Sequence, residues 1–145
     1  MDVIEKQRLM VVGIQVSVSQ DYLFTELPHI WNIFFERYKE IANRVDTKFM
    51  NICLSKKNCI NTHLICVEVN EFENIPDGMT ALDFPAYEYI YHIHHGKSGC
   101  IDDSFDKMSK WAIEKGYPIS DFKIDYGYFK GEKDPVEHTL LLRII

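Results

Sequence analysis

Cysteine is scarce in this sequence, and no two cysteines have the Cys-x-x-Cys spacing. Among its 145 residues are four cysteines, namely Cys53, Cys59, Cys66 and Cys100. Structural zinc sites and dithiol redox sites commonly use closely spaced pairs, so neither is indicated. The hydrophobic content of 46% is high enough to build a core without disulfides. We therefore expect reduced thiols, with Cys53 and Cys66 facing each other across a hairpin as small core residues.

The sequence also lacks a long apolar run. No stretch approaches the ~20 residues that a membrane-spanning helix needs. The start, Met1–Lys6, does not show the basic and then apolar order of a signal peptide. Its length is that of one domain with one core. These features predict a cytoplasmic domain over residues 1–145 that makes no membrane contact.

An excess of basic residues is missing as well. The net charge is -6, whereas a nucleic-acid surface needs clustered lysine and arginine. The glycines form neither of the phosphate-binding motifs, so no nucleotide or other cofactor is expected. His92 and His94 share one strand face, but zinc takes three or four ligands, and we expect no metal site. Direct binding to nucleic acid is therefore not expected.

The first half of the chain alternates between strand and helix patterns. Leu9–Val18 predicts a buried strand. A helix follows, capped by Thr25 with Pro28 near its first turn, and its apolar face includes Trp31 and Phe35. Asn51–Ser55 and His63–Val69 then predict two strands of a hairpin.

The same order of elements returns after the turn at Pro76–Gly78. We expect a short strand over Met79–Phe84, a long strand over Tyr87–His95, a helix over Asp102–Lys115 and two final strands, Asp121–Phe129 and His138–Ile145. The pattern predicts an α+β fold, a duplicated β-α-β-β unit with an antiparallel sheet and two helices on one face. The pseudo-repeats span about 7–75 and 79–145, and a ligand cleft is expected between the halves.

A row of aromatic residues indicates binding. Tyr87, Tyr89 and Tyr91 alternate along one predicted strand, which places their rings on the same face. Buried tyrosine hydroxyls need partners, so a pocket lined by these rings is one outcome. A planar cation gains ~0.5 to 2 kcal/mol from stacking on such a ring, and a nearby carboxylate selects its charge.

Six segments of the chain, taken in order, resemble the GyrI-like effector-binding domain. The same domain is fused to DNA-binding modules in AraC-type and MerR-type transcription regulators. The resemblance covers nearly the whole chain and rests on the runs Val11–Ile14, Leu27–Phe34, Ile65–Val69, Ile75–Met79, Pro85–Tyr89 with Gly96, and Leu140–Ile144.

The resemblance implies a cleft that binds hydrophobic, often cationic, aromatic drugs. The family places a carboxylate on the strand after the second helix, at a position that falls on Asp125. The tyrosine that follows two positions later in the family is Gly127 here, with Tyr126 and Tyr128 on either side. Glu68 and Glu88 are the alternative sources of the charge. The candidate ligand-binding residues are Trp31, Phe35, Glu68, Tyr89, Tyr91, Trp111, Asp125 and Tyr128.

Three classes of function follow from these features. The favoured class is a stand-alone multidrug-binding or sensor module for small hydrophobic cations, which would act in transcription regulation through a separate regulator or other protein partner. The second is a hydrolase of small molecules, as some GyrI-like relatives are. It would require an acid such as Asp125 or Glu68 with Tyr89, but no activated nucleophile is evident, and no catalytic residue is assigned. The third is an inhibitor that contacts a partner such as gyrase. A homo-oligomer is compatible with each class.

Overall fold

The computed structural model describes residues 1–145 as one sheet with two α-helices on it. The strands are β1 (Asp2–Lys6), β2 (Leu9–Ser19), β3 (Phe49–Lys57), β4 (Ile60–Glu68), β5 (Thr80–Phe84), β6 (Tyr87–Gly96), β7 (Ile119–Tyr128) and β8 (Val136–Ile144). The α-helices are α1 (Leu23–Arg37) and α2 (Ile101–Lys115), and the short 3-10 helices are η1 (Gln20–Tyr22), η2 (Tyr38–Glu40) and η3 (Ser98–Cys100). The predicted α+β fold class is confirmed.

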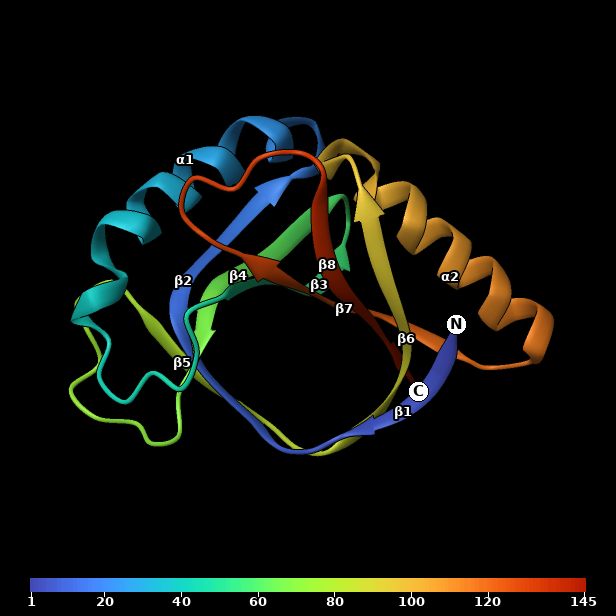
Figure 1. The fold of residues 1–145 in the computed structure, drawn as a ribbon, viewed down its shortest axis with the longest axis horizontal. Coiled ribbons are helices and arrows are strands. Elements are labelled where there is room, and N and C mark those ends of the chain that lie inside the picture. The colour runs from blue at the N-terminus through green and yellow to red at the C-terminus, as the bar shows by residue number, and fades with distance from the viewer.

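All eight strands form one antiparallel sheet in the order β1-β6-β8-β7-β3-β4-β2-β5. Each half contributes two strands, a helix and two more strands, and the halves meet at the centre of the sheet, where β3 pairs with β7. The sheet is strongly curved, and both helices lie on its outer side (Figure 1). The centre of the sheet, between the two helices, is therefore the junction of the halves.

Helix α1 begins earlier than the sequence predicts. Thr25 lies inside the helix, and Tyr22 occupies the N-cap position without a capping side-chain hydrogen bond. The turn η1 leads directly from β2 into α1, and its Gln20 N–H bonds to the Cys59 carbonyl oxygen, 2.9 Å away. The expected cap at Thr25 is therefore wrong, because η1 already fixes the start of the helix. Pro28 is the sixth residue of the helix and lacks the N–H that would bond to the Phe24 carbonyl oxygen.

Both helices bury an amphipathic face against the outer side of the sheet. Trp31 and Phe34 of α1 pack with β2, β3 and β4 residues, while Phe105 and Met108 of α2 pack with β6 and β8 residues. Helix α2 ends at Gly116, whose left-handed conformation (φ 80°) suits a glycine C-cap. The two helices thus cover the two halves separately. No helix combines the length and the apolar character that crossing a membrane would require.

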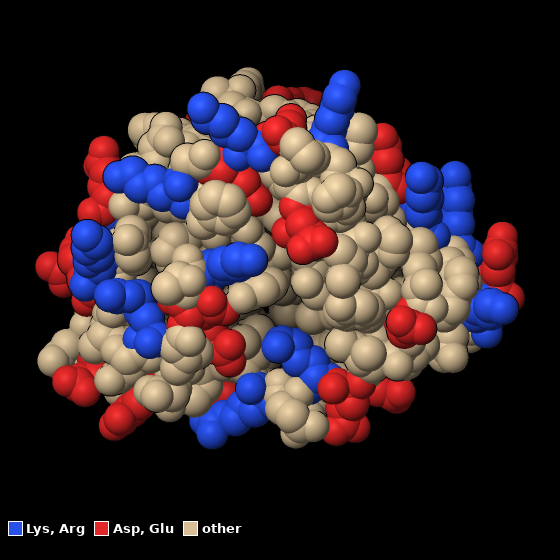
Figure 2. All heavy atoms as spheres, viewed as in Figure 1, with Lys and Arg blue, Asp and Glu red and all other residues tan.

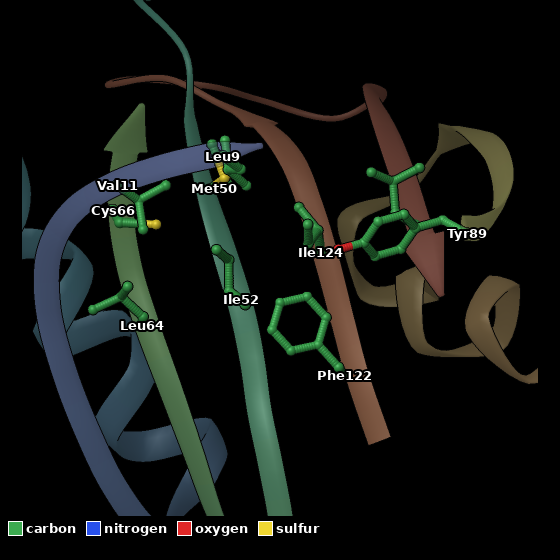
Figure 3. Packing of buried hydrophobic residues seen from close by; sticks show 10 residues of the cluster. Leu9, Val11, Met50, Ile52, Leu64, Cys66, Tyr89, Phe122 and Ile124 are labelled. Carbon is green, nitrogen blue, oxygen red and sulfur yellow. The ribbon is translucent and has the colours of Figure 1, made fainter. Parts of the chain in front are cut away.

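A third apolar cluster fills the concave side of the sheet. Figure 3 shows side chains from β2, β3, β4 and β7 together with Tyr89 of β6. The cluster contains Leu9, Val11, Met50, Ile52, Leu64, Cys66, Tyr89, Phe122, Ile124 and Leu141. Because β-strand residues alternate between faces, each central strand has one side chain in this cluster and the next under a helix. The concave face of the sheet is thus buried near its centre.

Two features of the sheet differ from the sequence analysis. Cys53 pairs with His63 and Cys66 with Met50, so the expected cysteine pair across the hairpin is wrong. Cys66 belongs to the concave cluster, whereas Cys53 lies on the face that carries the helices; all four thiols are free. The strand β1, which pairs with β6, was not predicted. Its five residues, Asp2–Lys6, are few and do not alternate between charged and apolar side chains, so they give no clear strand signal.

Candidate functional site

A cavity of about 380 Å³ lies between the two helices, above the junction of the halves. Its walls come from the first turns of α1 and from η3 and α2, and its floor comes from β3, β4 and β7. We call this cavity the helix-side cleft. The predicted site residues Asp125 and Tyr128 both line it. The cleft therefore joins the two halves of the fold.

A β-bulge at Gly127 places Asp125 and Tyr128 on the same face. Residues three apart in a regular strand point to opposite faces. Here the pairing between β3 and β7 shifts by one residue, because Met50 pairs with Tyr126 and Phe49 with Tyr128. Gly127 is the extra residue, with φ 136°, a conformation that favours glycine. The departure from the family pattern at Gly127 thus brings Tyr128 beside Asp125.

Asp125 is buried within a network of hydrogen bonds. Its side chain accepts one from the Tyr128 hydroxyl at 2.6 Å and contacts His138 Nδ1 at 2.6 Å. The other ring nitrogen of His138, Nε2, lies 2.9 Å from Glu132 Oε2. Both ring nitrogens therefore face carboxylates, an arrangement that a doubly protonated imidazolium satisfies.

The two carboxylates decide the charge of His138. Burial alone lowers the pKa of this side chain, but the hydrogen bonds and charges of Asp125 and Glu132 together raise it above the ordinary value of 6.5. The pKa of Tyr128 is raised far above its usual range, first by burial and then by the charge of Asp125. The network is thus an internal anion-cation-anion row with one surplus negative charge.

Aromatic rings of α1 extend this network. The ring of Trp31 lies against Tyr128, with centroids 4.2 Å apart, and against Phe35 at 5.2 Å. The Tyr128 ring also contacts the His138 ring edge at 4.4 Å. A second hollow of about 540 Å³, bordered by Trp31, Phe35 and Glu132, adjoins the helix-side cleft at Tyr128. Four of the predicted site residues therefore come together here: Trp31, Phe35, Asp125 and Tyr128.

The connection between β7 and β8 covers this aromatic group. It passes between the two helices in Figure 1, and its Glu132 is the second carboxylate of the His138 network. The Asp134 side chain holds the same connection to η3 through the Ser98 backbone N–H, 2.8 Å away. The connection is therefore both a wall of the site and a source of its charge.

A separate pocket of about 530 Å³ opens on the concave side of the sheet and contains two other predicted residues, Glu68 and Tyr91. Tyr126 also lines it and donates a hydrogen bond to Asp46. Burial, followed by the hydrogen bond and charge of Asp46, raises the pKa of Tyr126 beyond its usual range. We call this space the concave pocket; it has an apolar floor that includes Ile124.

The last two predicted residues lie apart from both sites. Tyr89 is buried in the concave cluster, where its hydroxyl accepts a hydrogen bond from Arg143 at 3.1 Å. Trp111 stacks on Tyr117, with centroids 5.9 Å apart, and packs at the edge of the α2 cluster. Glu88, the third carboxylate considered, is an exposed residue that pairs with Glu5 at the edge of the sheet.

Sequence reasoning missed the buried partner of Asp125. His138 alternates with Leu140 and Leu142 along β8, so strand parity places it on the buried outer face. A histidine at an apolar-facing position is a signal for a polar network. The sequence could not predict the role of Glu132, because its contact with His138 depends on the path of the β7–β8 connection.

The surface around these sites has mixed charge. Lysine, arginine, aspartate and glutamate side chains are interspersed over the face shown in Figure 2, with no broad patch of one sign. The carboxylates that matter for a ligand are thus those inside the two pockets.

The fold is that of GyrI-like effector-binding domains. The structure of SAV2435 bound to tetraphenylphosphonium superposes with a TM-score of 0.77 at 9% sequence identity, covering 99% of this chain and 93% of that one. The EcmrR C-terminal domain superposes with a TM-score of 0.74 at 14% identity, covering 99% and 96%. At these identities the likeness concerns the fold alone.

The sequence decides the family. Residues 2–138 match the family described as Cass2, integron-associated effector binding protein, and the chain belongs to that family. The transcriptional regulator BrlR of Pseudomonas aeruginosa is 28% identical over 138 residues, which make up 92% of this chain and 50% of BrlR. The chain thus spans about half the length of this curated relative. It is an effector-binding domain.

Proposed function

We propose that the chain binds small aromatic cations in the helix-side cleft. Asp125 supplies the negative charge and Tyr128, Phe24 and Phe105 supply ring surface in the cleft itself, while Trp31 and Phe35 extend this surface into the adjoining hollow at Tyr128. The observation that carries this proposal is the contact of a buried carboxylate with a tyrosine that itself stacks on a tryptophan, at the edge of a cavity. The fold likeness to SAV2435, whose structure holds tetraphenylphosphonium, supports a ligand of this class.

The charges at the site favour a monovalent cation. When His138 is protonated, Asp125 and Glu132 leave one negative charge unbalanced. A ligand cation beside Asp125 takes over part of the role of His138, in surroundings where charge interactions are stronger than in water. Stacking on each ring contributes ~0.5 to 2 kcal/mol. Micromolar binding needs ~8 kcal/mol, which two or three rings and the burial of apolar ligand surface supply together.

Glu68 in the concave pocket is the competing carboxylate. It forms no ion pair and lies half-buried in a larger space. However, only two aromatic rings, those of Tyr91 and Tyr126, line that pocket, and Tyr126 already donates its hydroxyl proton to Asp46. Phe24, Phe105 and Tyr128 line the helix-side cleft. The helix-side cleft offers more ring surface, so we assign the ligand charge to Asp125.

A matched pair of compounds tests this proposal. Methyltriphenylphosphonium and triphenylphosphine oxide have nearly the same shape, but only the first carries a net charge. Isothermal titration should give micromolar binding of the phosphonium and binding of the oxide at least about tenfold weaker, as expected for loss of a charge-assisted contact. Equal affinities would show that the charge of the ligand does not contribute to binding and that only its apolar surface does.

A further inference from the structure

One end of the helix-side cleft is basic, although the chain as a whole is acidic. Lys56 and Lys123 line this end together with His63 and Cys53. The opposite end holds Asp125 and Tyr128. The effector-binding role assigned to Asp125 leaves this basic group unused.

A second β-bulge brings Lys56 to this face. Cys53 pairs with His63, but Ser55 pairs with Thr62, so one extra residue is inserted at Leu54. As a result Lys56 pairs with Asn61, which shares the helix-side face with His63. Lys123, the direct neighbour of Cys53 on β7, points to the same space. A regular strand would have turned Lys56 to the concave side.

Neither lysine has an anionic partner. None of the ion pairs in the structure includes Lys56 or Lys123. Asp102 and Asp106 of α2 border the same cavity without bonding to them, and Lys123 Nζ lies 5.2 Å from the centroid of the Phe105 ring. Burial and then the charge of Lys56 lower the pKa of Lys123. Two like charges beside a cavity are stabilised when an anion lies between them.

His63, at the same end of the cleft, has a ring nitrogen without a hydrogen-bond partner. Its Nδ1 lies 2.8 Å from Asn51 Oδ1; because an amide oxygen only accepts, Nδ1 carries the proton and Nε2 has a free lone pair. That Nε2 atom is buried without a hydrogen-bond partner in a side chain that is only 7% exposed. An unmet buried acceptor is costly, and a ligand O–H or N–H would satisfy it.

We propose that the basic end of the cleft binds an acidic group of the effector through Lys56 and Lys123, so that the protein recognises amphoteric aromatic compounds. The inference rests on the proposed function, because the cationic end of the same ligand lies at Asp125. A hydroxyl or N–H next to the acidic group donates to His63 Nε2. The two ends of the cleft thus bind opposite charges on one molecule.

Rhodamine B and its ethyl ester test the inference. Both are fluorescent and carry a cationic xanthene ring system, but only rhodamine B also has a free carboxylate. Fluorescence anisotropy should show that the wild-type chain binds the acid at least about fivefold more tightly than the ester, the size expected of a partly exposed ion pair. In Lys56→Gln/Lys123→Gln this preference should vanish, while the ester should bind at least as tightly as it does to the wild-type chain, because two positive charges beside the cation are removed. Lys107→Gln/Lys110→Gln, an equal change of charge on two exposed residues of α2, should keep the preference.

The outcomes separate the two proposals. Equal binding of acid and ester by the wild-type chain would overturn the inference and leave cation binding at Asp125 intact. A preference for the acid that survives the double substitution would overturn the role of the two lysines. Binding of the acid with no binding of the ester would instead contradict the proposed cation site.

Discussion

At the scale of single residues, the clearest feature is a histidine ring held between two carboxylates. His138 is buried, and its nitrogens contact Asp125 and Glu132. Its pKa is raised above 6.5 in the folded chain, so the network stabilises the fold fully below about pH 6.5, the usual unfolded value. That stabilisation is lost as pH rises through the raised pKa.

We therefore expect the free energy of unfolding to decline above pH 6.5. Chemical denaturation of the wild-type chain and of His138→Gln at a series of pH values measures this decline. The glutamine can still donate a hydrogen bond but does not titrate, so the variant should lack the alkaline loss. The same loss in both proteins would show that His138 is not its source.

Another buried histidine, His63, predicts the opposite pH dependence. Burial, together with the charges of Lys56 and Lys123, lowers the pKa of His63 to about 4. The unfolded chain binds a proton near pH 6.5 and the folded chain does not, so stability falls as the pH drops from about 6.5 toward 4. His63→Gln should flatten this acid limb, whereas replacement of the exposed His29 by glutamine should not. An unchanged limb in His63→Gln would mean that the ring is protonated in the folded chain.

At the scale of elements, two bulges arrange the cleft. The bulge at Gly127 turns Tyr128 toward Asp125, and the bulge at Leu54 turns Lys56 toward His63. Strand patterns in the sequence predicted β3 and β7 but not these insertions, because a bulge shows itself only when a strand is aligned with its partner. For this reason the sequence named Asp125 and Tyr128 without explaining how both reach one face.

The role of the Gly127 bulge can be tested by adding a single methyl group at this position. A Cβ at this position would lie 2.9 Å from His138 Cδ2 and 3.0 Å from the Glu137 carbonyl oxygen, at a φ of 136°. Gly127→Ala should lower the free energy of unfolding by ~1 to 3 kcal/mol and weaken cation binding, because Tyr128 loses its place. Gly99→Ala meets no atom within 4 Å and serves as the control for stability. A fully stable Gly127→Ala would show that the strand can relax into regular pairing.

At the scale of the whole molecule, the duplicated order of elements was predictable because helix and strand periods differ and recur twice along the chain. The division of the eight candidate residues among separate places in the fold was not predictable. Parity alone puts Tyr91 and Glu68 on the concave side and Asp125 on the helix side, but only the three-dimensional sheet shows that these are two separate pockets. Trp111 and Tyr89 were candidate ligand-binding residues because they are aromatic. In the structure each packs against its own neighbours, away from both pockets.

The charge of the molecule predicts weak contact with DNA. The net charge is -6, and the acidic and basic side chains alternate over the face in Figure 2. DNA affinity depends on counterions released from phosphates by clustered lysine and arginine. We expect the chain of residues 1–145 to pass through a column of immobilised duplex DNA at low salt. Retention that weakens with added salt would contradict this expectation.

The most direct test of the central claim compares the two pocket carboxylates. Isothermal titration of methyltriphenylphosphonium should show that Asp125→Asn loses more than about tenfold in affinity, since a charge-assisted contact is worth ~1.5 to 3 kcal/mol. Glu68→Gln, which removes the same charge from the concave pocket, should bind within about twofold of the wild-type chain. Circular dichroism should show that both variants are folded. Wild-type affinity in Asp125→Asn together with a large loss in Glu68→Gln would place the ligand in the concave pocket and contradict the account.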